Sequence, residues 1–141
     1  MKVENPSKRL NTKLESEGAE FLVLGKLLIH GIASYKTYTN MPGYDLVATN
    51  PEENLSVRIQ VKSRYNTNWD GFIINNFDSD FVVFVALNRG HSRKKGDESY
   101  ILEPNFYVFP IEYVKKISDP NNSWGKIRKN FMVDFEKYET Q

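Results

Sequence analysis

Cysteine is absent from this chain of 141 residues, and there are only two histidines, His30 and His91. Without cysteine, disulfide frameworks and thiolate metal sites are excluded, and two histidines are too few for a histidine-based zinc site. No apolar run approaches the roughly 20 residues that a membrane-spanning helix needs, and the N-terminus has no apolar core of a signal peptide. We therefore expect a cytoplasmic protein that forms a single domain over residues 1–141.

Two common catalytic patterns are also missing. The sequence has no G-x-x-x-x-G-K-[ST] segment, so a P-loop is excluded. Ser63 has no convincing base for a serine-hydrolase triad. The net charge is only +1, which is not typical of a strongly basic nucleic-acid binder.

Local excesses of positive charge are present in two places. The clearer one is the stretch NRGHSRKKGD, which contains Arg89, Arg93, Lys94 and Lys95, and a second lies between residues 126 and 129. Such runs are either solvated loops or contacts to phosphate groups, and the sequence leaves both interpretations open.

The pattern of apolar residues predicts an α/β fold with a mixed sheet flanked by helices. The expected order is a helix over 11–30 ended by Gly31, then strands over 32–39, 44–49 and 55–63, and an irregular stretch over 66–80. A central strand over 81–87, a strand over 106–109, a short helix from 110 and a C-terminal segment over 123–141 follow. The run FVVFVAL is the most apolar in the chain and predicts a strand buried on both faces.

The first helix combines an apolar stripe with acidic residues. Wound at 100° per residue, Phe21, Leu24, Leu27 and Leu28 form the predicted stripe, and Glu17 and Glu20 fall on the same side. Carboxylates on a buried face are costly unless something pairs with them. Either both reach water at the edge of the stripe, or the helix directs one of them toward a polar site.

The segment PGYDLVATNPEENLSVRIQVKSR places polar residues where strands should form core. Gln60 and Lys62 share one strand face because the side-chain period is two, and Asp45 on the preceding strand can lie beside them. This set suits Mg²⁺, which prefers oxygen ligands. Asp45, the Gln60 side-chain oxygen and the Val61 carbonyl are the candidate ligands, while Lys62 would orient water or neutralise phosphate charge. The reaction class that follows is phosphodiester hydrolysis.

Three segments in this order resemble the PD-(D/E)xK nuclease superfamily: EGAEFLVLGKLLIHG, PGYDLVA and VRIQVKS. The resemblance, closest to small bacterial members with a Q-V-K motif, implies a restriction-endonuclease-like fold and Mg²⁺ or Mn²⁺ as cofactor, with DNA as substrate. It also implies that Asp45 and Gln60 are metal ligands, Lys62 is catalytic and Glu20 is an auxiliary carboxylate. Gln60 stands where the family pattern has Asp or Glu, which removes one negative charge from the metal site. Certain intron homing endonucleases similar to this chain work with Gln at this position.

Other interpretations of the same residues remain. Asp45 could simply cap its turn, and Lys62 could be solvated. The chain could be a catalytically inactive module of the same fold that binds nucleic acid or a protein partner, or an interaction protein with an incidental polar patch. For an active enzyme, Arg58, Arg64 and the basic loop from Arg89 to Lys95 are the candidate DNA contacts. Because cleavage of a duplex usually needs two active sites, we also expect a homodimer or larger assembly.

Overall fold

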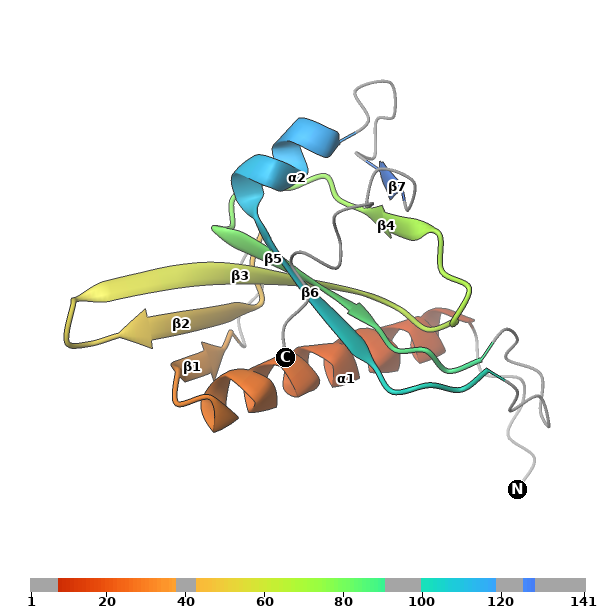
Figure 1. Ribbon diagram of the computed structural model, residues 1–141, viewed down its shortest axis with the longest axis horizontal. Helices are drawn as coiled ribbons and strands as arrows, with labels where there is room; N and C mark the ends of the chain where they lie inside the picture. The colour runs from red at the N-terminus through yellow and green to blue at the C-terminus, as the bar shows by residue number, and fades with distance from the viewer. Residues whose placement is uncertain (1–7, 38–42, 91–99, 119–125, 129–141) are drawn as a thin grey trace.

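The computed structural model describes residues 8–37, 43–90, 100–118 and 126–128 of the chain (Figure 1). Their elements in chain order are α1 (Lys8–Ile29), β1 (Ala33–Lys36), β2 (Leu46–Asn50), β3 (Leu55–Arg64), β4 (Gly71–Ile73), β5 (Phe81–Ala86), β6 (Asn105–Pro110), α2 (Ile111–Ile117) and β7 (Lys126–Arg128). No helix in these ranges is long and apolar enough to cross a membrane.

A five-stranded sheet in the order β1-β2-β3-β5-β6 organises the molecule, and β4 and β7 form a second, two-stranded sheet. In the larger sheet β3 runs parallel to β5, and every other neighbouring pair is antiparallel. The parallel pair requires a crossover connection, and this connection contains β4. The predicted α/β fold with a mixed sheet flanked by helices is confirmed.

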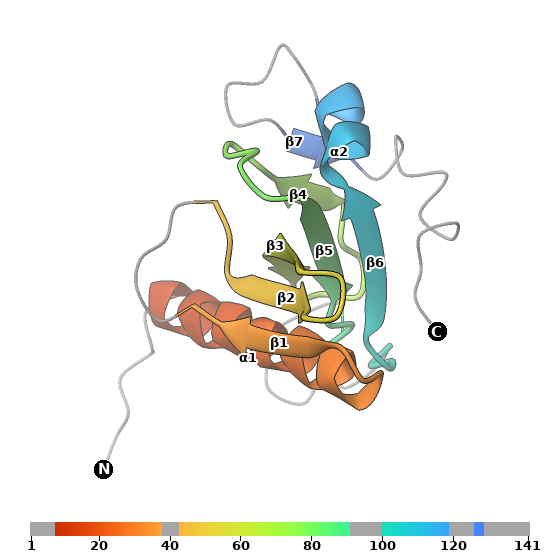
Figure 2. The same ribbon diagram turned by 90° about the vertical axis from the view of Figure 1, so that its left-hand side faces the viewer.

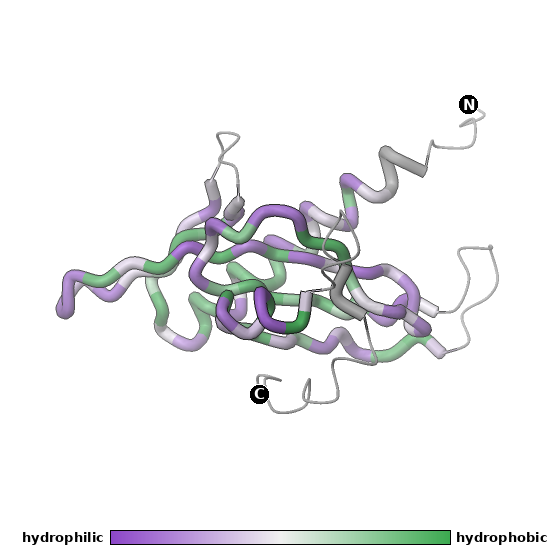
Figure 3. The backbone as a smooth tube through the Cα atoms, turned by 90° about the horizontal axis from the view of Figure 1, so that it is seen from above, coloured by the Kyte–Doolittle hydropathy of each residue, from purple (hydrophilic) through white to green (hydrophobic). Residues whose placement is uncertain are grey.

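Each face of the sheet has its own core. On one face α1 packs through Ala19 and Val23 against buried aliphatic residues of β2, β3 and β5 (Figure 2). The other face is largely aromatic, with the rings of Phe72 and Phe84 stacked 5.1 Å apart between centroids. Because β5 contributes to both cores, residues 82–86 are all buried, as the apolar run predicted. By contrast, the turn between β2 and β3 is hydrophilic (Figure 3).

The predicted apolar stripe of the first helix is wrong in part. Leu24 and Leu27 pack against the core as expected, together with Ala19 and Val23. Phe21 and Leu28, however, are 48% and 51% exposed and lie on the outer side of α1. The helix is apolar on two sides, so hydropathy alone does not decide which side meets the sheet.

Element boundaries differ from the expected ones mainly at loops. Gly31 ends α1 with φ +81°, a left-handed conformation that favours glycine, as predicted. The irregular stretch contains one short strand, β4, and the segment from Pro110 forms α2. Of the C-terminal segment only β7 lies within the described residues, and the rest of 123–141 falls outside them.

Candidate active site

A fork between β2 and β3 creates the site. Pairing of the two strands ends at Leu46 and Ile59, but β3 continues to Arg64. The Asp45 backbone still donates a hydrogen bond to the Ile59 carbonyl at 2.8 Å. Beyond this point β2 no longer supplies backbone acceptors to β3. The Asp45 carboxylate takes over this function, since its Oδ2 accepts a hydrogen bond from the Val61 N–H at 2.8 Å. Asp45 therefore satisfies the exposed edge of β3 and is held at the mouth of the fork.

The Val61 carbonyl faces the same opening. In a strand, the N–H and C=O groups of one residue point to the same side. The Val61 N–H points toward Asp45, so the carbonyl of Val61 lies on the side of the fork as well. Val61 is among the residues that line the cleft described below.

Gln60 is buried, with 6% of its surface exposed, and its amide group joins two loops. Its Nε2 donates hydrogen bonds of 3.0 Å to the carbonyls of both Gly43 and Asn76. Only the nitrogen of the amide can make these bonds, so Oε1 must occupy the other side of the group. This oxygen accepts no hydrogen bond from the described residues and remains available as a ligand atom.

Lys62 projects into the same region without a counter-ion. Its ammonium group makes no ion pair or hydrogen bond within the described residues, although the side chain is half-buried. Burial lowers the pKa of Lys62 below its usual 10.5, and the nearby Arg64 adds to this, whereas the Asp45 carboxylate opposes it. A lysine with a lowered pKa gives up its proton more readily than a solvated lysine does.

On the other side of the cleft, α1 contributes Glu20 in a charge network. Lys36 of β1 lies 2.7 Å from Glu20 Oε1 and 2.9 Å from Glu17 Oε1, with only 6% of the lysine side chain exposed. Desolvation raises the pKa of Glu20, as does the neighbouring charge of Asp45, while the bond to Lys36 opposes the rise. Glu20 lines the cleft, and Glu17 is half-exposed outside it.

The predicted catalytic residues Glu20, Asp45, Gln60 and Lys62 thus surround one cleft of about 400 Å³. Among the described residues there is no group of three His, Cys, Asp or Glu side chains that could hold a metal ion. The cleft offers instead two carboxylates, one amide oxygen and one backbone carbonyl, from Glu20, Asp45, Gln60 and Val61. These are hard oxygen donors, and Mg²⁺ is commonly held by one or two carboxylates with substrate phosphate completing its ligands. The donor set fits such an ion.

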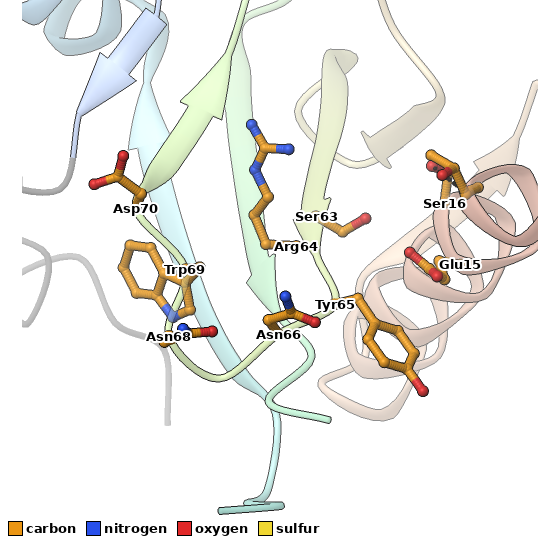
Figure 4. A pocket seen from close by; sticks show the side chains of 10 residues that line it. Glu15, Ser16, Ser63, Arg64, Tyr65, Asn66, Asn68, Trp69 and Asp70 are labelled. Atoms are coloured by element: carbon orange, nitrogen blue, oxygen red, sulfur yellow. Dashed lines mark hydrogen bonds between the residues drawn. The ribbon is translucent and has the colours of Figure 1, made fainter. Parts of the chain in front are cut away.

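A polar trough continues from the cleft along the end of β3. A second cavity of about 310 Å³ lies there, with Asn68 and Trp69 on one side and Glu15 and Tyr65 on the other (Figure 4). A smaller cavity connects it to the cleft, because it shares Lys62 with the cleft and Arg64 with the second cavity. The three cavities therefore form one polar path along the end of β3 on one side of the cleft.

The candidate DNA contacts are dispersed. Arg64 is exposed and lines the trough; its Nε donates to the Gly71 carbonyl at 2.7 Å, and its two terminal nitrogens make no hydrogen bond within the described residues. Arg58 is half-exposed and lies 3.7 Å from Asp80, so its charge is partly neutralised away from the cleft. Arg89 is exposed beside an isolated bridge to Ile101. Arg93, Lys94 and Lys95 lie outside the described residues.

Several residues at the site, among them Lys36, Gly43 and Asn76, were not anticipated from the sequence. Lys36 neutralises Glu20 from a neighbouring strand. Gly43 adopts φ +91°, and a Cβ there would clash with the Asn76 side chain. The sequence does contain a lysine within the first predicted strand, a Pro-Gly turn and the pair Asn75-Asn76. The residues that these groups contact are distant in sequence, so the sequence alone does not connect them to the site.

Comparisons with known proteins add little to this geometry. No protein-family model matches the chain, and no curated protein matches it. Among solved structures, the chain is similar to the bacterial homing endonuclease I-Ssp6803I, with a TM-score of 0.49 and 20% sequence identity, over 89% of this chain and 94% of that one. At this TM-score and identity the similarity carries no argument about activity.

Proposed function

We propose that the chain is a metal-dependent nuclease of the PD-(D/E)xK kind, which hydrolyses phosphodiester bonds in DNA. One observation carries the proposal: Glu20, Asp45, Gln60 and Lys62, which has no ion pair with any described residue, converge on a single cleft although they come from three separate segments. A turn cap and a solvated lysine would not require this convergence. The residue types also match the chemistry, since phosphodiester hydrolysis needs oxygen ligands for a cation and a positive group for the phosphate.

The roles follow from the contacts of each residue. Asp45, Gln60 Oε1 and the Val61 carbonyl would hold Mg²⁺ or Mn²⁺, with Glu20 as an auxiliary carboxylate. The bound cation supplies Lewis-acid stabilisation of phosphate charge and lowers the pKa of bound water. Lys62 would contact the phosphate oxygen as a cation or orient the attacking water, and its lowered pKa would favour proton exchange with that water. Arg64 would contact a neighbouring phosphate along the trough.

Calorimetric titration of Mg²⁺ and Mn²⁺ tests the metal site, with Asp45→Asn as the matched variant. Asparagine keeps an oxygen that can accept the Val61 N–H, so the fork stays intact while one negative charge is lost. We expect the variant to bind the cation at least about tenfold more weakly than the natural chain, because a carboxylate ligand becomes neutral.

Cleavage of plasmid and linear DNA in Mn²⁺ is the second measurement, with Lys62→Met as the catalytic control. Metal binding should survive this substitution and cleavage should not. A natural chain that binds no cation, even with DNA fragments present to supply phosphate, contradicts the proposal. Cleavage that persists in Asp45→Asn and Lys62→Met would point to a contaminating nuclease.

A catalytically inactive module that binds nucleic acid or a protein partner is the second candidate. The observation in its favour is the structural role of Gln60, whose amide joins two loops without any need for a metal. DNA binding that is indifferent to Mg²⁺ and to Asp45→Asn, with no cleavage, would support this candidate over the enzyme.

A further inference from the structure

The second cavity of the trough, between α1 and the loop that follows β3, is lined by a polar group that no described contact uses. The side-chain amide of Asn66 makes no hydrogen bond within the described residues, and its Oδ1 is buried without a donor. Most buried polar atoms in proteins are paired, so this acceptor needs a donor from outside these contacts. The terminal torsion of asparagine is broad, so a small rotation of the amide presents its acceptor and its donors to the cavity.

The charged side chains that line the second cavity indicate what kind of group fits there. Glu15 and Asp70 contribute two carboxylates, and Arg64 contributes one cation. A phosphate group in this cavity would therefore meet more like charge than opposite charge, which Coulomb repulsion disfavours. A neutral base fits better, because carboxylates accept hydrogen bonds from exocyclic amino groups and an asparagine amide pairs with adjacent donors and acceptors on a base edge.

The second cavity is continuous with the cleft. The smaller cavity between them shares Ser16 with both, Lys62 with the cleft and Arg64 with the second cavity. Lys62 and Arg64 are two residues apart on β3, which corresponds to roughly 7 Å along a strand. A group in the second cavity can therefore belong to the same molecule as a phosphate in the cleft.

We propose that the second cavity binds an unpaired nucleobase of the DNA strand whose phosphate lies in the cleft, so that the substrate is single-stranded beside the cleaved bond. Asn66 bonds to the edge of the base, and Trp69 supplies an aromatic contact (Figure 4). The volume of about 310 Å³ lies at the lower end of the range for small-ligand sites. A base in a duplex is stacked and paired, so it must leave the duplex to enter a cavity. The position of the phosphate rests on the proposed function, whereas base binding can be measured without cleavage.

The fluorescence of Trp69 measures occupancy of the second cavity. Trp69 and Trp124 are the two tryptophans of the chain, so Trp124→Phe leaves Trp69 as the only one. We expect single-stranded oligonucleotides of about six nucleotides to quench this fluorescence saturably at low ionic strength. The titration is done in EDTA, where metal-dependent cleavage does not occur, and repeated in Ca²⁺, another cation that takes oxygen ligands.

Two further probes separate bases from phosphates and single strands from duplexes. An abasic oligonucleotide of the same length keeps the phosphates and loses the bases, so it should bind at least about tenfold more weakly. A blunt duplex of the same sequence should also bind at least about tenfold more weakly, because its bases are stacked and paired. Both comparisons use the same protein, so they do not depend on the folding of a variant.

Asn66→Ala tests the residue that contacts the base. We expect this variant to bind the single strand about tenfold more weakly and the abasic strand within about twofold of the natural residue, because only a base contact is lost. Asn50→Ala is the matched control, since Asn50 is exposed and pairs with Leu55 at the other end of β3. It should change the dissociation constant of the single strand less than about twofold.

Three results would overturn the proposal. They are equal affinities for the single strand and either the abasic strand or the duplex, an equal effect of Asn66→Ala on the single and abasic strands, and Trp69 fluorescence that no oligonucleotide quenches in EDTA or Ca²⁺. Failure of the proposed function is a different result. A chain that binds no cation and cuts no DNA loses the nuclease function, but base-dependent quenching of Trp69 would still establish the base site. A chain that binds Mg²⁺ and cleaves DNA without such quenching keeps the nuclease function and loses the base site.

Discussion

Replacing Gln60 with glutamate has opposite expected effects when it is judged from the sequence motif and from the hydrogen bonds in the structure. By motif alone, Gln60→Glu restores the acidic residue of the PD-(D/E)xK pattern and should strengthen the cleft as a metal site. The structure predicts the opposite for the metal-free protein. Both carbonyls that Gln60 meets, those of Gly43 and Asn76, need a donor, and an ionised carboxylate only accepts.

The magnitude follows from the contacts. Two hydrogen bonds of 3.0 Å are lost, each contributing about 1 kcal/mol. A carboxylate that is only 6% exposed is also placed against two carbonyl oxygens, which adds at least about 1–2 kcal/mol for an unpaired buried charge. We expect Gln60→Glu to lower the free energy of unfolding by about 3–4 kcal/mol at neutral pH. Gln60→Met loses the two hydrogen bonds from Nε2 but places no charge in the site, so it should lower the free energy of unfolding by about 2 kcal/mol.

The loss of stability in Gln60→Glu should increase as the pH rises. Burial beside carbonyl oxygens raises the folded-state pKa of the new carboxyl above its unfolded value, because the protonated form can donate one bond. Stability from such a group is fully present below the unfolded pKa, about 4.3, and is lost as the pH rises through the folded pKa. The difference in the free energy of unfolding between Gln60→Glu and Gln60→Met should therefore be small near pH 4 and widen toward neutral pH.

Urea unfolding in EDTA, followed by circular dichroism from pH 4 to 8, measures all three proteins under the same conditions. Equal midpoints for Gln60→Glu and the natural chain at pH 7.5 would refute the reasoning, because Nε2 would then not be the group that faces the two carbonyls. Adding Mg²⁺ afterwards should restore part of the lost stability only if the cleft holds the cation.

Three further outcomes follow from other parts of the structure. Gly18→Ala and Gly25→Ala should each raise the free energy of unfolding by about 0.5–1 kcal/mol, since a Cβ at either position meets nothing within 4 Å; a lower free energy of unfolding in urea titrations would contradict this. Lys36→Met should lower the free energy of unfolding by about 3 kcal/mol, because it leaves Glu20 half-buried without its partner, and Lys36→Arg should recover part of that in the same assay. Burial lowers the folded-state pKa of Lys62, so its charge opposes folding at neutral pH. Lys62→Met should therefore raise the urea midpoint at pH 7. The difference in midpoint between this variant and the natural chain should disappear as the pH approaches 10.5.

Much of the fold follows from local patterns. The apolar run at 81–87 requires a strand covered on both faces, and the alternation over 55–63 sets one side of β3 against α1. Gly31 ends the helix because its left-handed backbone is one that few other residues adopt. These features depend on residues that are close in sequence, which is why one chain suffices to predict them.

The orientation of α1 and the role of Gln60 depend on distant partners. A helix with apolar residues on two sides gives no internal signal for the side that meets the sheet, so Phe21 was assigned to the wrong one. Gln60 shows a similar limit, since its hydrogen bonds go to a turn 17 residues before it and a loop 16 residues after it. Spacing within a strand identifies the polar face but not the groups that it meets.

Two lysines beside the cleft differ in the partners that the described residues give them. Lys36 is satisfied by two glutamates, whereas the ammonium group of Lys62 has no anionic partner within hydrogen-bonding or ion-pair distance among the described residues. A half-buried charge without a partner costs stability, and such costs are typical of functional sites. Mutation of Lys62 to an apolar residue would remove this loss of stability. The requirements of folding alone therefore do not account for a lysine at this position. An anion that enters the cleft would supply such a partner for Lys62, and a cation held by Asp45 would offset the repulsion between that carboxylate and a phosphate. The lysine and the carboxylate beside it therefore agree with the proposed function, in which a phosphate and a metal ion would share the cleft.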